Sequence, residues 1–289
     1  MRNMSYDRTG KVDLSTIYNE ENPVSYFSTL SALDYRIPEE GKSIFKRLIG
    51  ARRKAAGAED VKLIDVGCSY GVNAALLKHG MSMEELYRLY GDEGADTPEL
   101  VARDQSLYAD PADEHLQWVG LDRAEQAVAY ALETGMMDAG VAVSLEHEEP
   151  EGDDARAIAN ADMIISTGCI GYVTEATLRR LVESGGEHKP WMAHFVLRMF
   201  PYEPVEEMAR EHGYVTEKLE GLFPQRRFAS LEERKQVLAN LEKAGIDARG
   251  AETSGWYFAE LYVSRPEEDA RRAPLDDLIT GSLRPPFAA

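Results

Sequence analysis

The stretch Val61–Gly71, which reads VKLIDVGCSYG, decides the fold. Its first six residues are mostly apolar, which predicts a short strand buried on both faces, as in a parallel sheet. Gly67 and Gly71 follow, and glycine adopts conformations that other residues avoid and leaves room for a ligand. The helical pattern of Asn73–His79 ends at Gly80. We therefore expect a strand, a tight turn and a helix whose free N–H groups suit a carboxylate or a phosphate.

Strands and helices alternate over the rest of the chain. The further predicted strands are Gln117–Asp122, Val141–Leu145, Met163–Ser166, Trp191–Leu197 and Tyr257–Val263. The principal predicted helices are Gly41–Ala56, Glu125–Thr134, Thr174–Ser184 and Leu231–Ala244. Such alternation predicts an α/β, Rossmann-like, doubly wound fold that binds ligands at the carboxyl ends of its strands. We expect a mostly parallel sheet of seven strands, with helices on both faces and a final antiparallel strand.

Composition divides the chain into three parts. Residues 1–40 are rich in aromatic and turn-forming residues and are expected to form an N-terminal extension that caps another part. Residues 41–265 contain the alternating units, with a helical insertion at about 81–108 and a proline-containing, lid-like insertion at about 201–229. Residues 266–289 are polar and contain prolines, so we expect a loosely attached tail.

Charge and cysteine content narrow the classes of function. The net charge of -19 opposes nucleic-acid binding, because a phosphate backbone would be repelled over most of the surface. Cys68 and Cys169 lack metal-ligand spacing, so we expect reduced thiols and no metal. Met1–Gly10 lacks the apolar run of a secretory signal, and the longest apolar stretch, Met163–Val173, is too short to span a bilayer. A cytoplasmic protein with no membrane partner is expected.

The turn after the first strand separates two kinds of cofactor. A dinucleotide fingerprint, G-x-G-x-x-G, would need glycine where Ser69 and Val72 stand, which disfavours a nicotinamide-dependent oxidoreductase. The remaining pattern, D-x-G-x-x-x-G from Asp65 to Gly71, resembles the first motif of class I S-adenosylmethionine-dependent methyltransferases. Ser69 replaces the usual middle glycine of that motif.

The resemblance implies a cofactor site. In that family this loop holds the methionine portion of S-adenosylmethionine, which assigns to the cofactor Asp65, Gly67, Cys68, Ser69 and Gly71. Asp122 ends the second strand, where the family places an acid that bonds the ribose hydroxyls; the alternative is a surface residue that caps the next helix. The family also places residues beside the reactive methyl after the fourth strand, here Ser166, Thr167 and Gly168, which a flexible loop would equally explain.

Two residues are candidates for catalysis. Arg198 ends the fifth strand, where it would bind a substrate carboxylate through paired hydrogen bonds or form a salt bridge with one of the many acids. Tyr172 follows the fourth strand, where it would help to cage a sulfonium or belong to the core. The same two interpretations apply to Tyr26, Tyr35 and Tyr202.

Three other positions are weighed as part of the site. His194 lies in the middle of the fifth strand and is expected to be a core histidine. Glu146 follows the third strand and would face an adenine or solvent. Arg226 and Arg227 are expected to anchor the lid-like insertion.

The resemblance implies an S-adenosylmethionine-dependent methyltransferase that acts on an oxygen or nitrogen of a small-molecule metabolite. Positioning and desolvation would supply much of the rate, and a base is needed only for a protonated acceptor. One alternative is an enzyme of the same fold that uses S-adenosylmethionine without transferring its methyl group. The others are a nicotinamide-dependent oxidoreductase and a non-catalytic binding protein. A small-molecule acceptor is the expected partner, and a homodimer is one possible assembly.

Overall fold

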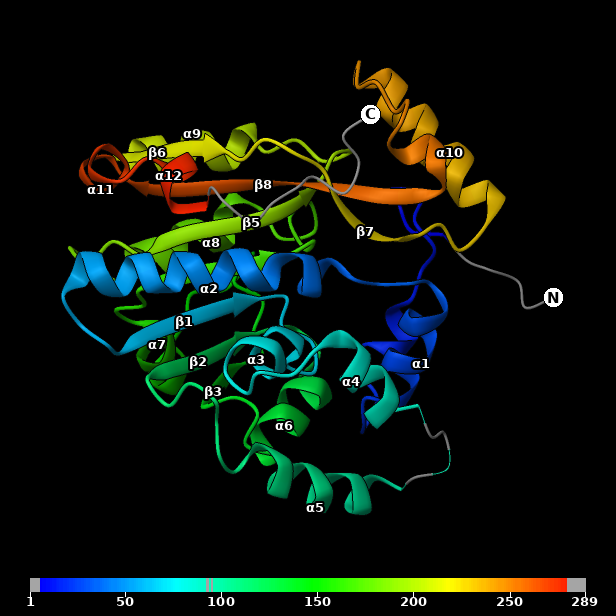
Figure 1. The fold of residues 1–289 in the computed structure, drawn as a ribbon, viewed down its shortest axis with the longest axis horizontal. Coiled ribbons are helices and arrows are strands. Elements are labelled where there is room, and N and C mark those ends of the chain that lie inside the picture. Colours follow the sequence, from blue (N-terminus) through cyan, green and yellow to red (C-terminus); the bar gives the residue numbers. More distant parts are fainter. Residues whose placement is uncertain (1–5, 92–93, 95, 280–289) are drawn as a thin grey trace.

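A single sheet of eight strands forms the centre of the computed structural model, which describes residues 6–91, 94 and 96–279 (Figure 1). The strand order is β3-β2-β1-β4-β5-β8-β6, and β7 also pairs with β8. The strands are β1 (Val61–Val66), β2 (Leu116–Leu121), β3 (Ala139–Val141), β4 (Met163–Thr167), β5 (Trp191–Leu197), β6 (Tyr214–Lys218), β7 (Phe223–Arg227) and β8 (Trp256–Pro266). Strands β1 to β5 are parallel, and β8 runs antiparallel to β5, β6 and β7.

Helices cover both faces of the sheet. The helices of nine or more residues are α1 (Val24–Ala32), α2 (Ile37–Ala56), α5 (Thr97–Tyr108), α6 (Glu125–Glu133), α8 (Glu175–Glu183), α9 (Glu203–Glu211) and α10 (Leu231–Lys243). The shorter ones are α3 (Val72–Leu77), α4 (Met83–Leu89), α7 (Gly152–Ile158), α11 (Glu267–Arg272), α12 (Leu275–Ile279) and the 3-10 turns η1 (Ser15–Ile17) and η2 (Glu252–Ser254). Alternate strand residues pack against α2, α3 and α6 on one face and against α7, α8 and α9 on the other, because side chains of a strand alternate in direction.

The predicted fold class is confirmed, with one strand more than expected. Strands β1, β2, β4 and β5 lie where apolar runs predicted them, and β5 has the predicted bounds. The third parallel strand spans Ala139–Val141, so the prediction of Val141–Leu145 is wrong except for its first residue. Every residue of β5 is buried, as expected for a strand covered on both faces. The carboxyl ends of the parallel strands meet at one edge, where Asp65 of β1 lies opposite Gly120 of β2 and Ile165 of β4.

The stretch 201–229 is part of the sheet rather than a lid-like insertion. It forms α9, β6 and β7, and the two strands pair with successive parts of β8. Pro204 lies in the first turn of α9 and Pro224 in a strand at the sheet edge, two places where the missing N–H of proline is tolerated. The prolines therefore indicated a helix start and an edge strand, not a loop.

The N-terminal extension packs across the edge at which the parallel strands end. Figure 1 shows α1 and the preceding chain, in blue, beyond the arrowheads of β1 and β2. Tyr26, Phe27 and Leu30 of α1 are buried in the main core. Helix α2 begins at Ile37, four residues before the predicted start, with Pro38 in its first turn. The predicted helical insertion at about 81–108 corresponds to α4 and α5.

Residues 267–279 are not a loose tail. They form α11 and α12, and Leu275 and Ile279 are buried in the main core. Asp269 accepts a hydrogen bond from the indole of Trp191 at 2.9 Å. Apolar side chains in short helices thus fasten this segment to the domain, and residues 280–289 of the predicted tail lie outside the described residues.

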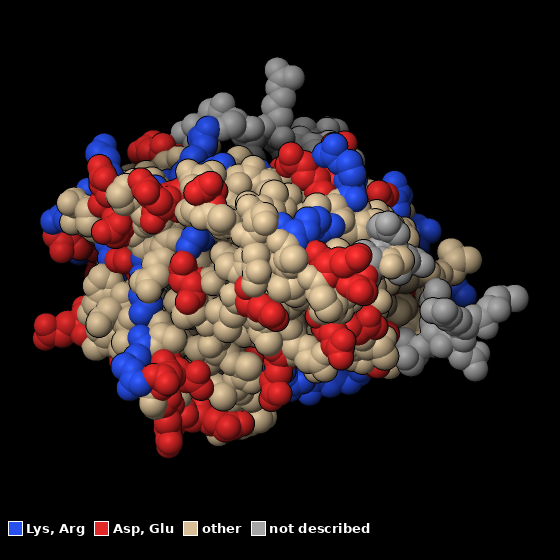
Figure 2. Space-filling view, turned by 90° about the horizontal axis from the view of Figure 1, so that it is seen from below, with Lys and Arg blue, Asp and Glu red and all other residues tan. Residues whose placement is uncertain are grey.

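Surface charge and helix hydropathy bear on two kinds of partner, nucleic acids and membranes. Among the described residues drawn in Figure 2, basic side chains are interspersed with acidic ones and form no continuous stripe on that face. Within the described ranges, no helix is both long enough and apolar enough to cross a bilayer.

Candidate functional site

The turn after β1 has a left-handed backbone at three positions. Gly67, Ser69 and Gly71 have φ of 73°, 49° and 78°. At Gly67 a Cβ would lie 2.8 Å from the Cβ of Cys169, so a larger residue would require a backbone shift. Ser69 is accommodated in this region although glycine is usual there. The turn therefore has a defined shape and leaves the exposed backbone of Gly67 at the strand edge.

Asp65 is a buried carboxyl group with an incomplete set of hydrogen bonds. It is 1% exposed, and its Oδ1 accepts from Asn73 Nδ2 at 3.0 Å. Its Oδ2 is buried and has no partner in the described chain. Burial raises the pKa of Asp65 to about 8, and the charge of Asp122 adds to the rise. At neutral pH this group is mostly protonated and able to donate a hydrogen bond.

Asp122 connects the turn to the start of α6. Its Oδ2 accepts from Ser69 N at 2.8 Å, and its Oδ1 accepts from Ala124 N at 3.0 Å. The helix-capping role that was the alternative is wrong, because the N-cap of α6 is Ala124 and it has no side-chain capping hydrogen bond. Each carboxylate oxygen has two acceptor directions, so both oxygens keep one for a ligand hydroxyl.

The end of β4 brings Thr167 and Gly168 to the site but not Ser166. Thr167 Oγ1 accepts from Asn73 Nδ2 at 3.1 Å, the same amide that bonds Asp65. Ser166 lies on the other face of the sheet, where its hydroxyl bonds His194 Nδ1 at 2.8 Å. Its side chain points away from that of Thr167, because successive strand residues point to opposite faces, and its assignment to the cofactor stays a prediction.

His194 is the core histidine that its position in β5 predicted. It is fully buried, and burial lowers its pKa to about 3. The ring is therefore neutral at physiological pH and inaccessible to a ligand.

Gln225 belongs to the site, although the sequence pattern did not indicate it. At Gly168, where φ is 95°, a Cβ would lie 2.2 Å from Gln225 Nε2. Gln225 is 4% exposed, and its Oε1 has no partner among the described residues. Residue 225 lies in β7, and only the pairing of β7 with β8 brings it to the loop after β4. The motif PQRRF contains no local signal for this contact.

Unpartnered buried polar atoms gather at this edge. They are Asp65 Oδ2, Ser69 Oγ, Asn73 Oδ1 and Gln225 Oε1. A buried polar group without a partner costs about 1–3 kcal/mol, so proteins rarely keep several together. A polar ligand that supplied donors and acceptors here would remove that cost.

The two cysteines supply shape rather than a nucleophile. Burial raises the pKa of both thiols, that of Cys169 to about 12, so neither is a thiolate at neutral pH. Cys169 Sγ donates to the Val66 carbonyl at 3.2 Å. Cys68 is 2% exposed, and its sulfur packs against Gly120. A Cβ at Gly120 would lie only 2.7 Å from that sulfur. Only the backbone of Cys68 is placed to face a ligand.

The N-terminal segment contacts both the turn and the start of α6. Glu20 N donates to the hydroxyl of Tyr70, which lies in the turn, at 2.9 Å. Gln126 N, in the first turn of α6, donates to Asn19 Oδ1 at 2.8 Å. The ring of Tyr26 lies 5.4 Å from that of Tyr70. This segment is therefore positioned to cover a ligand bound at Asp65 and Asp122.

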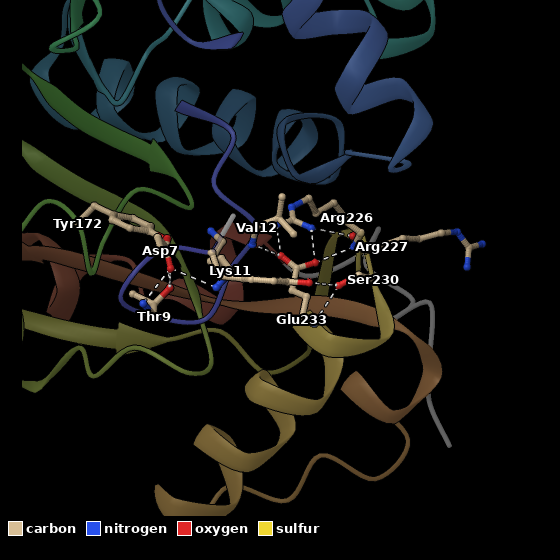
Figure 3. Close-up of polar contacts among 11 residues, drawn as sticks. Asp7, Thr9, Lys11, Val12, Tyr172, Arg226, Arg227, Ser230 and Glu233 are labelled. Atoms are coloured by element: carbon tan, nitrogen blue, oxygen red, sulfur yellow. Dashed lines mark hydrogen bonds and ion pairs between the residues drawn. The ribbon is translucent and has the colours of Figure 1, made fainter. Parts of the chain in front are cut away.

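Residues 6–12 form a second polar region with Tyr172, Arg226 and Glu233, which we call the hairpin anchor (Figure 3). Glu233 is fully buried and accepts from Arg226 at 2.8 and 3.1 Å. It also accepts from Val12 N at 2.7 Å and from Ala229 N at 2.6 Å. Burial raises the pKa of Glu233, but the Arg226 guanidinium and these N–H groups outweigh that effect and hold it below its ordinary value.

The two candidate catalytic residues have structural partners. Tyr172 donates to Asp7 Oδ2 at 2.5 Å, and so holds the hairpin. Arg198 donates to Glu252 Oε2 at 2.6 Å and to the Asp247 carbonyl at 2.9 Å. This is the salt bridge that was the alternative to binding a substrate carboxylate. A catalytic role for either residue stays a prediction.

Two other weighed positions have structural partners outside the site. Tyr202 is buried and stacks on Tyr262 with ring centroids 4.2 Å apart, so it is a core residue. Glu146 accepts from Thr174 N and Oγ1 at 2.8 and 2.7 Å, and thus holds the N-cap residue of α8. Among the residues that the structure describes, no cluster of three or more His, Cys, Asp or Glu is arranged to hold a metal.

Comparisons with known proteins give matches in structure but not in sequence. No protein-family model matches the chain, and no curated protein matches it in sequence. A plantazolicin methyltransferase bound to a triazolic desmethylPZN analogue and S-adenosylhomocysteine is 11% identical, with a TM-score of 0.40 over 88% of this chain and 100% of that one. A cyclopropane-fatty-acyl-phospholipid synthase-like protein from Lactobacillus casei ATCC 334 is 12% identical, with a TM-score of 0.39 over 85% and 99%.

A third match is a precorrin-6y C5,15-methyltransferase from Geobacter metallireducens GS-15. It is 10% identical, with a TM-score of 0.38 over 91% of this chain and 100% of that one. The strand order and the direction of β8 are observed directly in the present chain. This strand order and the antiparallel β8 show that the protein has a Rossmann-like α/β fold, with a glycine-containing turn at the carboxyl end of its first strand.

Proposed function

We propose that this chain is an S-adenosylmethionine-dependent methyltransferase that acts on an oxygen or nitrogen of a small molecule. The observation that carries the proposal is the group of buried, unpartnered polar atoms on Asp65, Ser69 and Asn73 beside the turn. Asp65 and Ser69 lie within the D-x-G-x-x-x-G motif and Asn73 follows it, at the carboxyl edge of a parallel sheet, where such folds bind ligands.

The chemistry of these residues fits the cofactor. The exposed backbone of Gly67 would hold its amino-acid portion, and the neighbouring Asp65 would donate a hydrogen bond while it is protonated. The free acceptor directions of Asp122 would bind two ribose hydroxyls. Bound there, S-adenosylmethionine would supply an electrophilic methyl group on its sulfonium.

The residues of this chain would act mainly by positioning and by excluding water. The thiols and His194 are unsuited to abstract a proton, because their pKa values keep the thiols protonated and the imidazole buried and neutral. The N-terminal segment would cover the cofactor through its contacts to the turn and to α6. Orientation of the reactants alone supplies a large rate enhancement, up to about 7–11 kcal/mol of the barrier.

Calorimetry with S-adenosylmethionine and S-adenosylhomocysteine tests the proposal. We expect both to bind the wild-type chain and NADH to show no binding. Asp122→Asn should weaken S-adenosylhomocysteine by about tenfold or more, because hydrogen bonds to a charged group contribute about 1.5–3 kcal/mol. The control is Asp153→Asn, which alters a carboxylate whose side chain is 93% exposed and should bind as the wild type does.

Product analysis then tests the reaction. Incubation with a panel of small acceptors should yield S-adenosylhomocysteine, whereas methylthioadenosine would indicate transfer of another part of the cofactor. Failure of the wild type to bind either cofactor form would contradict the proposal.

A further inference from the structure

We infer that Lys11 forms an anion-binding subsite for the acceptor, so that the molecule methylated carries a carboxylate. This inference rests on the proposed function, since it assigns a substrate class to the same site. Three features of Lys11 support it: the turn that presents its side chain, an ammonium group without a partner among the described residues, and the charges around that group.

The hairpin presents Lys11 between two aromatic rings. Asp7 Oδ1 accepts from Thr9 N at 2.8 Å and from Lys11 N at 3.1 Å, and Gly10 has a φ of 84°. These contacts close a tight turn and fix the backbone from which Lys11 extends. Its Nζ lies 5.1 Å from the ring centroid of Tyr172 and 5.7 Å from that of Tyr257. Both distances are typical of a cation held by aromatic faces.

The ammonium group of Lys11 differs from its charged neighbours, because no residue that the structure describes accepts a hydrogen bond from it. Asp7 accepts from Thr9, Lys11 N and Tyr172, and Glu233 pairs with Arg226 in a bidentate manner. Within the described part of the chain, Lys11 Nζ takes part in no hydrogen bond or ion pair. Since the side chain is only half-buried, a ligand can supply the missing acceptor.

The surroundings favour Lys11 as a cation and a singly charged ligand. Aromatic faces stabilise the protonated amine, which argues for binding rather than for a role as a base. Burial and the charge of Arg226 lower the pKa of Lys11 to about 8, so it is protonated at neutral pH. The charges of Lys11 and Arg226 are balanced by those of Asp7 and Glu233. A carboxylate therefore fits this group better than a phosphate dianion does.

The subsite adjoins the proposed cofactor turn. Tyr172 follows Gly168 in the loop after β4, and Gly168 contacts Gln225, the neighbour of Arg226 in β7. The pKa of Tyr18 responds to the charges of both Asp122 and Arg226. A small acceptor held at Lys11 would thus lie on the side of the β4 loop that faces the N-terminal segment.

Binding of benzoate and of its neutral isostere benzamide tests the inference. Titrations use the full chain saturated with S-adenosylhomocysteine and are repeated without it. We expect wild type to bind benzoate about tenfold or more tightly than benzamide or inorganic phosphate, because a charged hydrogen bond is the stronger one. Lys11→Met should abolish that preference, and Lys11→Arg should retain it because it keeps the cation. The matched control, Lys235→Met, changes a lysine whose side chain is 76% exposed on α10 and should bind as wild type.

A pH series on the wild type needs no variant. The groups that face Lys11 are Asp7, Tyr172, Arg226, Glu233 and Tyr257. Burial raises the pKa of both tyrosines, and hydrogen bonds lower the pKa of both acids, so none of these titrates near pH 8. Benzoate affinity should be constant below about pH 7 and fall above about pH 8, as Lys11 loses its proton.

Each outcome decides the inference. Equal binding of benzoate and benzamide, tighter binding of phosphate, or loss of benzoate binding in Lys11→Arg with its cofactor affinity retained would overturn it. Retained benzoate binding with no affinity for S-adenosylhomocysteine would instead overturn the proposed function and leave the carboxylate subsite standing.

Discussion

The turn after β1 and the hairpin anchor each contain a buried acidic side chain, and the two differ in their hydrogen bonds. Asp65 is 1% exposed and has one donor among the described residues, Asn73, and burial raises its pKa to about 8. Glu233 is fully buried, but a guanidinium and two backbone N–H groups hold its pKa below the ordinary value. The comparison indicates that a satisfied carboxylate holds the chain together, whereas an unsatisfied one marks a ligand site.

Glu233→Gln would break the hairpin anchor and has the largest expected effect. Arg226 would become an uncompensated buried charge, which costs about 3–5 kcal/mol of unfolding free energy. Urea denaturation measures the loss. Glu232→Gln changes a carboxylate on the same helix whose side chain is 56% exposed, and should alter stability by less than about 0.5 kcal/mol. Equal stability of the two variants would refute the structural role of Glu233.

Asp65→Asn tests whether the buried Asp65 makes the free energy of unfolding depend on pH. The raised pKa of Asp65 means that the folded chain keeps a proton, from about pH 4 to about pH 8, that the unfolded chain has lost. Its contribution to stability is therefore complete at low pH and falls by about 1.4 kcal/mol per pH unit in this window. The Asn variant lacks this loss.

The measurement is denaturation of both proteins at two pH values. Between about pH 5 and pH 7, wild type should lose about 3 kcal/mol relative to Asp65→Asn. Asp153→Asn serves as the control and should follow the wild-type curve. Parallel curves for wild type and Asp65→Asn would show that Asp65 is ionised in the folded chain.

Gly67→Ala tests whether the turn has space only for glycine. The new Cβ would lie 2.8 Å from that of Cys169 on a backbone with a φ of 73°, so we expect a loss of about 2 kcal/mol together with weaker S-adenosylhomocysteine binding. Gly57→Ala is the matched control, because φ is 65° there and no atom lies within 4 Å. Thermal unfolding that lowers both variants equally would show that strain alone, and not the contact, is responsible.

Tyr172→Phe has the smallest expected effect. It removes one of the donors to Asp7 but keeps the ring beside Lys11. A loss of about 1 kcal/mol in stability is expected, with S-adenosylhomocysteine affinity within about twofold of wild type. Chemical denaturation and calorimetry provide the two readings. A larger loss of cofactor affinity than of stability would support the earlier interpretation of Tyr172 as a residue of the reaction site.

Local patterns in the sequence determined four of the five parallel strands, the principal helices between them and the glycine-containing turn. Apolar runs and helical periodicity act over a few residues, so the bounds of β5 and the positions of Gly67 and Gly71 could be read directly. Only the tertiary structure decided the rest. Pairing with β8 places the strands of the stretch 201–229 in the sheet and brings Gln225 next to Gly168. The alternation of side chains along β4 directs the Ser166 hydroxyl to His194, on the other face of the sheet.

The partners of the polar residues were equally beyond the sequence. Arg198 forms its salt bridge with Glu252, which is 54 positions away in the sequence. The hairpin that carries Lys11 is held by a hydrogen bond from Val12 N to Glu233, 221 positions later. Hydrogen bonds and charges act between groups that folding brings together, and spacing along the chain does not encode them. The motif at Asp65 therefore indicated where a ligand binds, while the fold decided which groups are left to bind it.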